Sequence, residues 1–172
     1  MIVVRDDFFI TVSLEKTKVI EDFEKKKIKN FQTYKKTRFI FQIMYLNASY
    51  YLTYLKQINK ETEIAEYILK NSMKNKELLK LLSIEKGLVY FTTAIKSNEL
   101  VMEKTLRGKI IKLYEDDEEI LEDAITENRQ AIEMAQIYTN ILNGTMDCLL
   151  YTSTPPFHGG DMGSIPVRVT NN

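Results

Sequence analysis

The sequence predicts an α+β fold, predominantly α, with a short N-terminal β-hairpin, a long antiparallel helical hairpin and a long final helix. Two short apolar runs near the N-terminus are rich in β-branched and aromatic residues and favour paired strands. Residues 33–71 contain neither Pro nor Gly, and apolar residues recur at helical spacing there and through residues 74–107. A heptad pattern then follows in residues 114–147.

The composition is that of a folded domain with balanced charge. The 172 residues carry 24 Lys plus Arg and 24 Asp plus Glu, so no excess of basic charge favours nucleic acid as a partner. The single cysteine, Cys148, cannot build a disulfide framework or a multi-Cys zinc site within the chain. The N-terminus lacks the pattern of a secretory signal, and no run approaches the ~20 apolar residues that span a bilayer. These features fit a reducing, cytoplasmic setting.

The first segment, residues 1–32, contains the predicted strands. Ile2–Val4 and Phe8–Val12 flank a turn at residues 5–7. Because an isolated two-stranded hairpin is marginally stable, we expect the rest of a sheet to precede Met1. Residues 19–29 then mix apolar residues with charges as a short amphipathic helix does.

The second segment, residues 33–112, is a helical hairpin. Its two helices are predicted over residues 33–71 and 74–107, and the short connection between them favours an antiparallel arrangement. Asn71 and Ser72 offer the side chains that cap a helix N-terminus, and Gly108 is a candidate for the C-terminal cap.

The third segment, residues 113–147, is predicted to form a single helix with two inner rows of residues. The rows are Leu121, Asn128, Ala135 and Leu142, and Ile125, Ile132, Thr139 and Met146. Such a stripe packs against other helices, and a polar Asn128 within it would fix the register at some cost in stability. We expect this helix to self-associate, in preference to packing only within its own chain.

The last segment, residues 148–172, is predicted to be an irregular tail. It contains all three Pro residues of the chain, its only His and no sustained period. The pair Pro155-Pro156 stops any helix. We expect the tail to be aberrant, arising from a frameshift or a chimeric join after Asp147.

Several segments resemble the CorA family of magnesium transporters. The stretch from Glu127 to Asp147, ENRQAIEMAQIYTNILNGTMD, is similar to the family's stalk helix just before its first membrane helix. The segments KTRFIFQ at residue 36, KNKEL at residue 74 and LVYFTT at residue 88 are similar to its helical hairpin. The resemblance covers roughly Asp6 to Asp147. The family's Gly-Met-Asn pore motif occurs nowhere in the sequence.

The resemblance implies a fragment of a transporter for magnesium, with cobalt and nickel as further candidate ions, rather than an enzyme. Residues 1–32 would then be the end of a cytosolic α/β domain, and the intact protein would be a homopentamer of the cell membrane. This segment would lie on the cytoplasmic side, with the membrane helices missing at its C-terminus. The alternative is a soluble helical protein that acts in oligomerisation or interaction.

The resemblance also implies two metal-binding residues. Asp147 matches the position of an acidic ring on the pore side of the stalk, where five carboxylates would attract Mg²⁺. Asp123 matches the stalk acid that helps to bind regulatory Mg²⁺ between neighbouring cytosolic domains. Bound ions would screen carboxylates that otherwise repel one another, and so would hold the pore closed.

For the other candidate sites, a structural interpretation is favoured over a functional one. The acidic run 115–119 favours charge compensation at a helix N-terminus over a metal cluster. Residues 25–29 are Lys-rich and read as a solvated face rather than a lipid contact, and the cluster Tyr50, Tyr51 and Tyr54 reads as helix packing. His158 has no partner at metal spacing, and neither a catalytic triad nor a phosphate-binding loop is present in the sequence.

Overall fold

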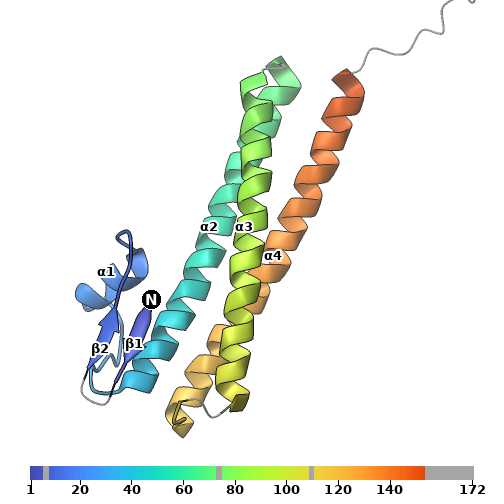
Figure 1. Ribbon diagram of the computed structural model, residues 1–172. Helices are drawn as coiled ribbons and strands as arrows, with labels where there is room; N and C mark the ends of the chain where they lie inside the picture. Colours follow the sequence, from blue (N-terminus) through green and yellow to red (C-terminus); the bar gives the residue numbers. More distant parts are fainter. Residues whose placement is uncertain (6–7, 73–74, 109–110, 154–172) are drawn as a thin grey trace, which may run out of the picture.

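A computed structural model describes residues 1–5, 8–72, 75–108 and 111–153. The predominantly helical α+β fold is confirmed: a two-stranded sheet is followed by one short and three long helices (Figure 1). The elements in chain order are β1 (Ile2–Val4), β2 (Phe9–Thr11), α1 (Lys18–Glu24), α2 (Lys36–Ser72), α3 (Asn75–Gly108) and α4 (Glu115–Ser153). The predicted aberrant tail lies outside the described residues from position 154 onward, and His158 with it.

The N-terminal strands pair as predicted. β1 and β2 are antiparallel, with Val3 opposite Ile10, and the backbone N–H of Val12 donates to the carbonyl of Met1 at 2.8 Å. Helix α1 follows and is capped by the hydroxyl of Thr17, which accepts from the backbone N–H of Ile20 at 3.4 Å. An N-cap of this kind satisfies one of the free N–H groups of the first turn.

Aromatic rings attach this N-terminal module to the start of α2. The ring of Phe39 lies 4.3 Å from that of Phe9, 4.8 Å from that of Phe23 and 4.8 Å from that of Phe31, measured between centroids. Tilted and edge-on contacts at these distances stabilise aromatic clusters beyond the burial of their area. The module therefore rests on the first turns of α2.

The three long helices form a bundle (Figure 1). Helices α2 and α3 lie antiparallel, as predicted from their short connection, and α4 returns parallel to α2. An apolar seam runs along the bundle in two clusters. The lower cluster contains Ile40, Phe41, Met102, Leu121, Ala124 and Ile125. The upper cluster contains Leu52, Leu55, Ala65, Leu69, Leu81, Leu88, Ile95, Ala131, Ile132, Ala135, Leu142 and Met146.

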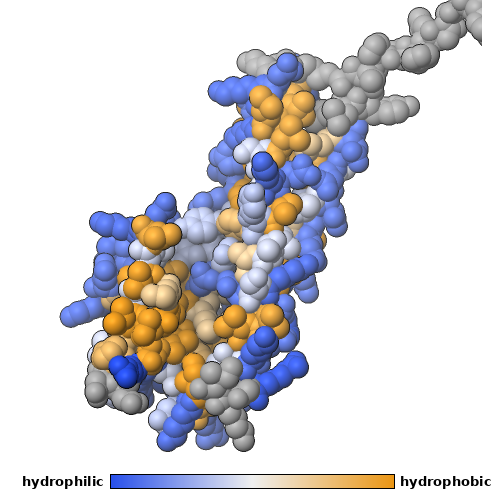
Figure 2. Space-filling model, viewed as in Figure 1, coloured by the Kyte–Doolittle hydropathy of each residue, from blue (hydrophilic) through white to orange (hydrophobic). Residues whose placement is uncertain are grey.

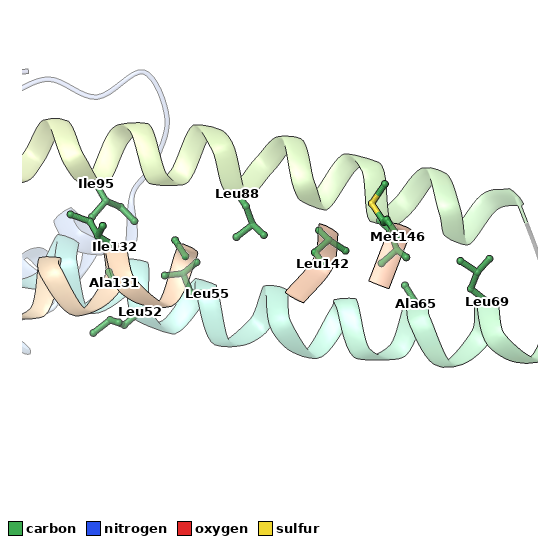
Figure 3. Packing of buried hydrophobic residues seen from close by; sticks show 12 residues of the cluster. Leu52, Leu55, Ala65, Leu69, Leu88, Ile95, Ala131, Ile132, Leu142 and Met146 are labelled. Atoms are coloured by element: carbon green, nitrogen blue, oxygen red, sulfur yellow. The ribbon is translucent and has the colours of Figure 1, made fainter. Parts of the chain in front are cut away.

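The inner stripe of α4 packs within its own chain, which corrects the expectation that it seeks partner helices from other chains. Leu121 and Leu142 are fully buried. Figure 3 shows Leu142 and Met146 lying between α2 and α3. A heptad pattern reports that a helix face is buried, but it does not say which chain buries it.

Two predicted helix ends differ from the structure. Helix α4 continues to Ser153, six residues beyond the predicted end at Asp147, because residues 148–153 contain no helix breaker and the first Pro comes only at position 155. Asn71 does not cap α3. It lies within α2, where its side-chain amide donates to the carbonyl of Tyr67 at 2.7 Å.

The surface is uneven in character. Figure 2 shows apolar side chains gathered over the N-terminal hairpin, where Ile2, Val4, Ile10 and Val12 are all 40% exposed or more. None of the helices in the described part of the chain has both the length and the apolar character needed to cross a bilayer.

Candidate metal-binding residues on helix α4

The two predicted metal-binding residues both lie on α4, on its exposed surface. Helix α4 turns its apolar side towards α2 and α3, and this leaves Asp123 and Asp147 in solvent. Neither acid is held in place by a hydrogen bond or ion pair among the contacts of the described residues. Both carboxylates are therefore open to an ion or to another molecule.

Asp123 lies in an acidic ridge that sequence reasoning did not single out. Glu119 and Glu127 stand one turn before it and one turn after it, so three carboxylates follow one another along the same side of the helix. Like charges at this spacing destabilise a helix modestly, and a cation would relieve the repulsion. The i, i+4, i+8 spacing was the signal that could have identified the ridge.

Asp147 lies near the other end of α4, beside two amide side chains. Asn140 and Asn143 precede it by two turns and one turn, and at ~100° per residue all three point to the same flank of the helix. All three side chains are exposed. Amide and carboxylate oxygens are the ligands that hard cations such as Mg²⁺ prefer. The two asparagines were also missed by sequence reasoning.

The two acids cannot hold the same ion within one chain. They are separated by 24 positions on one unbroken helix, which corresponds to about 36 Å along the axis. In the described ranges, no three His, Cys, Asp or Glu side chains come together as a metal site. A cation at either residue would therefore complete its coordination with water or with oxygens from another chain.

Three carboxyls on other helices have a lowered pKa and serve the fold. A hydrogen bond from Lys25 lowers the pKa of Glu21, one from Lys27 lowers the pKa of Asp22, and one from Lys80 lowers the pKa of Glu61. Each of the three has a lysine partner within 2.8 Å. These are ordinary surface ion pairs, which contribute little individually to stability.

The acidic run has the structural role that its sequence predicted. Residues 115–118 form the first turn of α4, where negative charge complements the helix dipole. Asp117 is additionally buried and lies 3.6 Å from the guanidinium of Arg38 on α2.

The tyrosine cluster also serves the fold, as predicted. The rings of Tyr50 and Tyr54 stack 6.1 Å apart, and the ring of Tyr51 meets Phe91 of α3 edge-on at 5.1 Å. The Tyr50 hydroxyl donates to the carboxylate of Asp22, which ties α1 to α2. Lys25 and Lys27 pair with acids of α1, as a solvated helix face does.

Comparisons with known proteins agree on one family. The model of the family described as CorA-like Mg²⁺ transporter protein matches residues 1–153. A solved structure, the complete CorA magnesium transporter from Methanocaldococcus jannaschii, is similar to this chain with a TM-score of 0.78 and 23% identity. The match covers 88% of this chain and 49% of that one, so the chain spans about half of that transporter. No curated protein matches the sequence.

Proposed function

The chain belongs to the CorA-like Mg²⁺ transporter family, and on that premise we propose that it is part of a divalent-cation transporter in which α4 is the stalk helix leading to the membrane. The observation that carries the proposal is the family match over residues 1–153, which takes in the whole of α4. A transport role agrees with the absence of a catalytic constellation from the sequence.

The outward surface of α4 supports a role in assembly with further copies of the chain. Ile137 and Ile141 lie one turn apart on that surface and are 54% and 52% exposed. Gly144 and Cys148 continue the same side of the helix and are also exposed. Exposed apolar side chains beside small ones allow the close approach of another helix, so this outward stripe, rather than the buried inner one, would face the neighbouring stalks.

In such an assembly Asp123 would bind regulatory Mg²⁺ together with oxygens of the next subunit. The acidic ridge of Glu119, Asp123 and Glu127 repels its counterpart on a neighbouring chain unless cations screen it. Mg²⁺ would therefore stabilise the assembled state, and its depletion would release the subunits. This differential binding would couple the magnesium concentration on the cytoplasmic side to the state of the pore.

Asp147 would act as a ring of carboxylates where the stalk approaches the cell membrane. Mg²⁺ keeps much of its water shell, so an exposed ring of carboxylates with Asn140 and Asn143 beside it would attract the hydrated ion without stripping it. Cobalt and nickel are divalent cations of the same charge and would be attracted in the same way.

The test is the oligomeric mass of the chain by light scattering, first in millimolar Mg²⁺ and then in chelator. We expect a larger species, up to a pentamer, in Mg²⁺ and dissociation in chelator. Asp123→Asn is expected to abolish this dependence. The matched control is Glu122→Gln, which removes an exposed carboxylate one residue away and should leave the dependence intact.

The alternative function, a soluble helical interaction protein, predicts a different result. Its assembly would depend on the exposed apolar residues of α4 and would be the same with Mg²⁺ and with chelator. An oligomer that does not respond to Mg²⁺ in either the wild-type chain or Asp123→Asn would favour that alternative over the transporter reading.

A further inference from the structure

One polar side chain is buried in the otherwise apolar seam between α3 and α4. Asn128 is 1% exposed, and its amide nitrogen donates to the backbone carbonyl of Ile95 on α3 at 3.0 Å. Its amide oxygen has no hydrogen-bond partner among the residues that the structure describes. A buried polar group that is only half satisfied stabilises poorly, so its presence calls for a reason other than stability.

The next residue makes a second link to the same helix. The guanidinium of Arg129 reaches Glu99 through Nε at 2.7 Å and Glu103 through Nη2 at 2.5 Å. The two glutamates are one turn apart on α3, so a single arginine spans both. Asn128, inside the bundle, and Arg129, on its surface, thus both link α4 to α3 at the same height along the bundle axis.

The apolar contacts by themselves only weakly fix the axial position of α4 relative to α3. Leu, Ile and Ala alternate along α4, and a slip of one helical turn, about 5.4 Å, would again place apolar residues against apolar residues. The charges disfavour such a slip, because Arg129 would lose one of its two glutamates in either direction. One turn in one direction would set Arg129 against Arg107 in place of Glu99, and one turn in the other would set it against buried Ile95 in place of Glu103.

The polar level also lies where the bundle core divides. The lower cluster ends at Ile125 of α4, and the upper cluster begins at Ala131. We propose that Asn128 and Arg129 together fix the axial register of α4 against α3. Because α4 is unbroken to Ser153, this pair sets the axial position of every later residue of the helix, Asp147 included.

The experiment measures the register directly, as the distance between spin labels at Ser83 of α3 and Glu133 of α4. Both positions are exposed, and Cys148→Ser removes the native thiol. We expect one distance population in this background. In Asn128→Leu with Arg129→Gln we expect a second distance population, produced by an axial slip of one helical turn, about 5.4 Å. The melting temperature should hold or rise, because Leu removes the unsatisfied amide oxygen.

The matched control is Thr105→Val with Lys25→Gln. Thr105 is buried, and its hydroxyl donates to the carbonyl of Val101 in its own helix, while Lys25 pairs with Glu21 of α1. This variant also removes a buried hydrogen bond and a surface ion pair, but no link between α3 and α4, so it should keep one population.

A single unshifted population in the Asn128→Leu, Arg129→Gln variant would overturn the proposal. If that variant does not fold, a charge reversal decides the question with Asn128 in place. Arg129→Glu alone should broaden the distribution, and adding Glu99→Arg and Glu103→Arg should restore one population at the original distance. Failure of the restored charges to narrow the distribution would equally overturn it.

Discussion

Among single residues, Lys26 has an unfavourable backbone conformation. Its φ is 53°, and it follows the C-cap Lys25 of α1. The N–H groups of Lys26 and Lys27 bond the carbonyls of Phe23 and Asp22, both at 3.0 Å, which is the Schellman arrangement that favours Gly at this position. A side chain with a Cβ is strained there.

Lys26→Gly is therefore expected to raise the free energy of unfolding by roughly 0.5–1 kcal/mol. Urea unfolding followed by circular dichroism measures the change. Lys26→Ala loses the same charge and long side chain but keeps the Cβ, so it should give no comparable gain. Equal stabilisation by Ala and Gly would show that charge, not conformation, is responsible.

The hydrogen bond between Tyr50 and Asp22 gives the docking of α1 a dependence on pH. The bond from its hydroxyl to Asp22 raises the pKa of Tyr50 from 10.0 to about 12, and the bonds from Lys27 and Tyr50 lower the pKa of Asp22. The raised pKa of Tyr50 stabilises the fold at pH values below about 10. This contribution is lost as the pH rises through about 12. The lowered pKa of Asp22 also stabilises the fold, and this contribution is lost as the pH falls through the pKa that Asp22 has in the folded state.

Tyr50→Phe is accordingly expected to be less stable than the wild type at neutral pH, with the difference shrinking between pH 10 and about 12 and again in acid. Urea unfolding across this range measures it. Asp22→Asn should cause a similar loss, and the double variant should not add the two losses, because both break one interaction. Full additivity would contradict the coupling.

Contacts such as the one between Asp22 and Tyr50 could not be predicted from the sequence. Asp22 and Tyr50 belong to different helices, and nothing in the spacing along the chain brings them together. Asp123 and Asp147 could be singled out only through the family resemblance, and they remain predictions as metal-binding residues. Their neighbours Asn140 and Asn143 became visible once the helix geometry placed them on one flank.

At the scale of elements, α4 has a buried face and an exposed face, and two adjacent residues lie one on each. Leu142 is fully buried between α2 and α3, whereas Ile141 is 52% exposed. Leu142→Ala should lower the free energy of unfolding by about 2–5 kcal/mol through lost burial and the cavity it leaves. Ile141→Ala should change it by no more than about 0.5 kcal/mol.

The same pair tests the proposed assembly face. Unfolding is measured in chelator, and oligomeric mass in Mg²⁺. Ile141→Ala is expected to weaken the association of folded chains. Leu142→Ala should change the oligomeric mass only by lowering the fraction of chains that are folded. If Ile141→Ala leaves the mass in Mg²⁺ unchanged, the outward stripe of α4 is not the face that meets other chains.

The elements themselves were largely predictable. The long helices begin within three residues of their predicted starts, because runs without Pro or Gly and with helical apolar spacing leave little alternative. The end of α4 was wrong because the change in composition after Asp147 was taken as a change in structure. Cys148, Leu149 and Leu150 are compatible with a helix, and only Pro155 is not.

At the scale of the whole molecule, stability is distributed unequally. The hairpin of β1 and β2 has side chains exposed on both strands, and a two-stranded sheet gains little from its own pairing. The bundle buries an apolar seam made of two clusters. Hydrogen exchange should therefore show the amides of residues 2–4 and 9–11 opening at a lower free energy than those near Leu55 and Leu88. Equal protection in both regions would contradict this.

The fold class followed from the sequence, but the arrangement of the bundle did not. Periodicity showed that α4 buries one face, and Asn128 was expected to fix a register between chains. The structure places its hydrogen bond on Ile95 of the same chain. Which partner covers an amphipathic helix depends on contacts between distant segments, and a repeat pattern in one segment contains no information on them.

The parallel arrangement of α2 and α4 has a consequence for the synthesis of the protein. The ribosome completes α2 and α3 first, and Phe41, Leu55 and Leu88 stay uncovered on their inner sides until α4 emerges. Translation at about 5–20 residues per second makes that delay a few seconds, whereas helices form in about a microsecond. For that interval the nascent chain displays an open apolar groove that fits an amphipathic helix, and it is then that a chaperone or a neighbouring nascent chain competes with α4 for the groove.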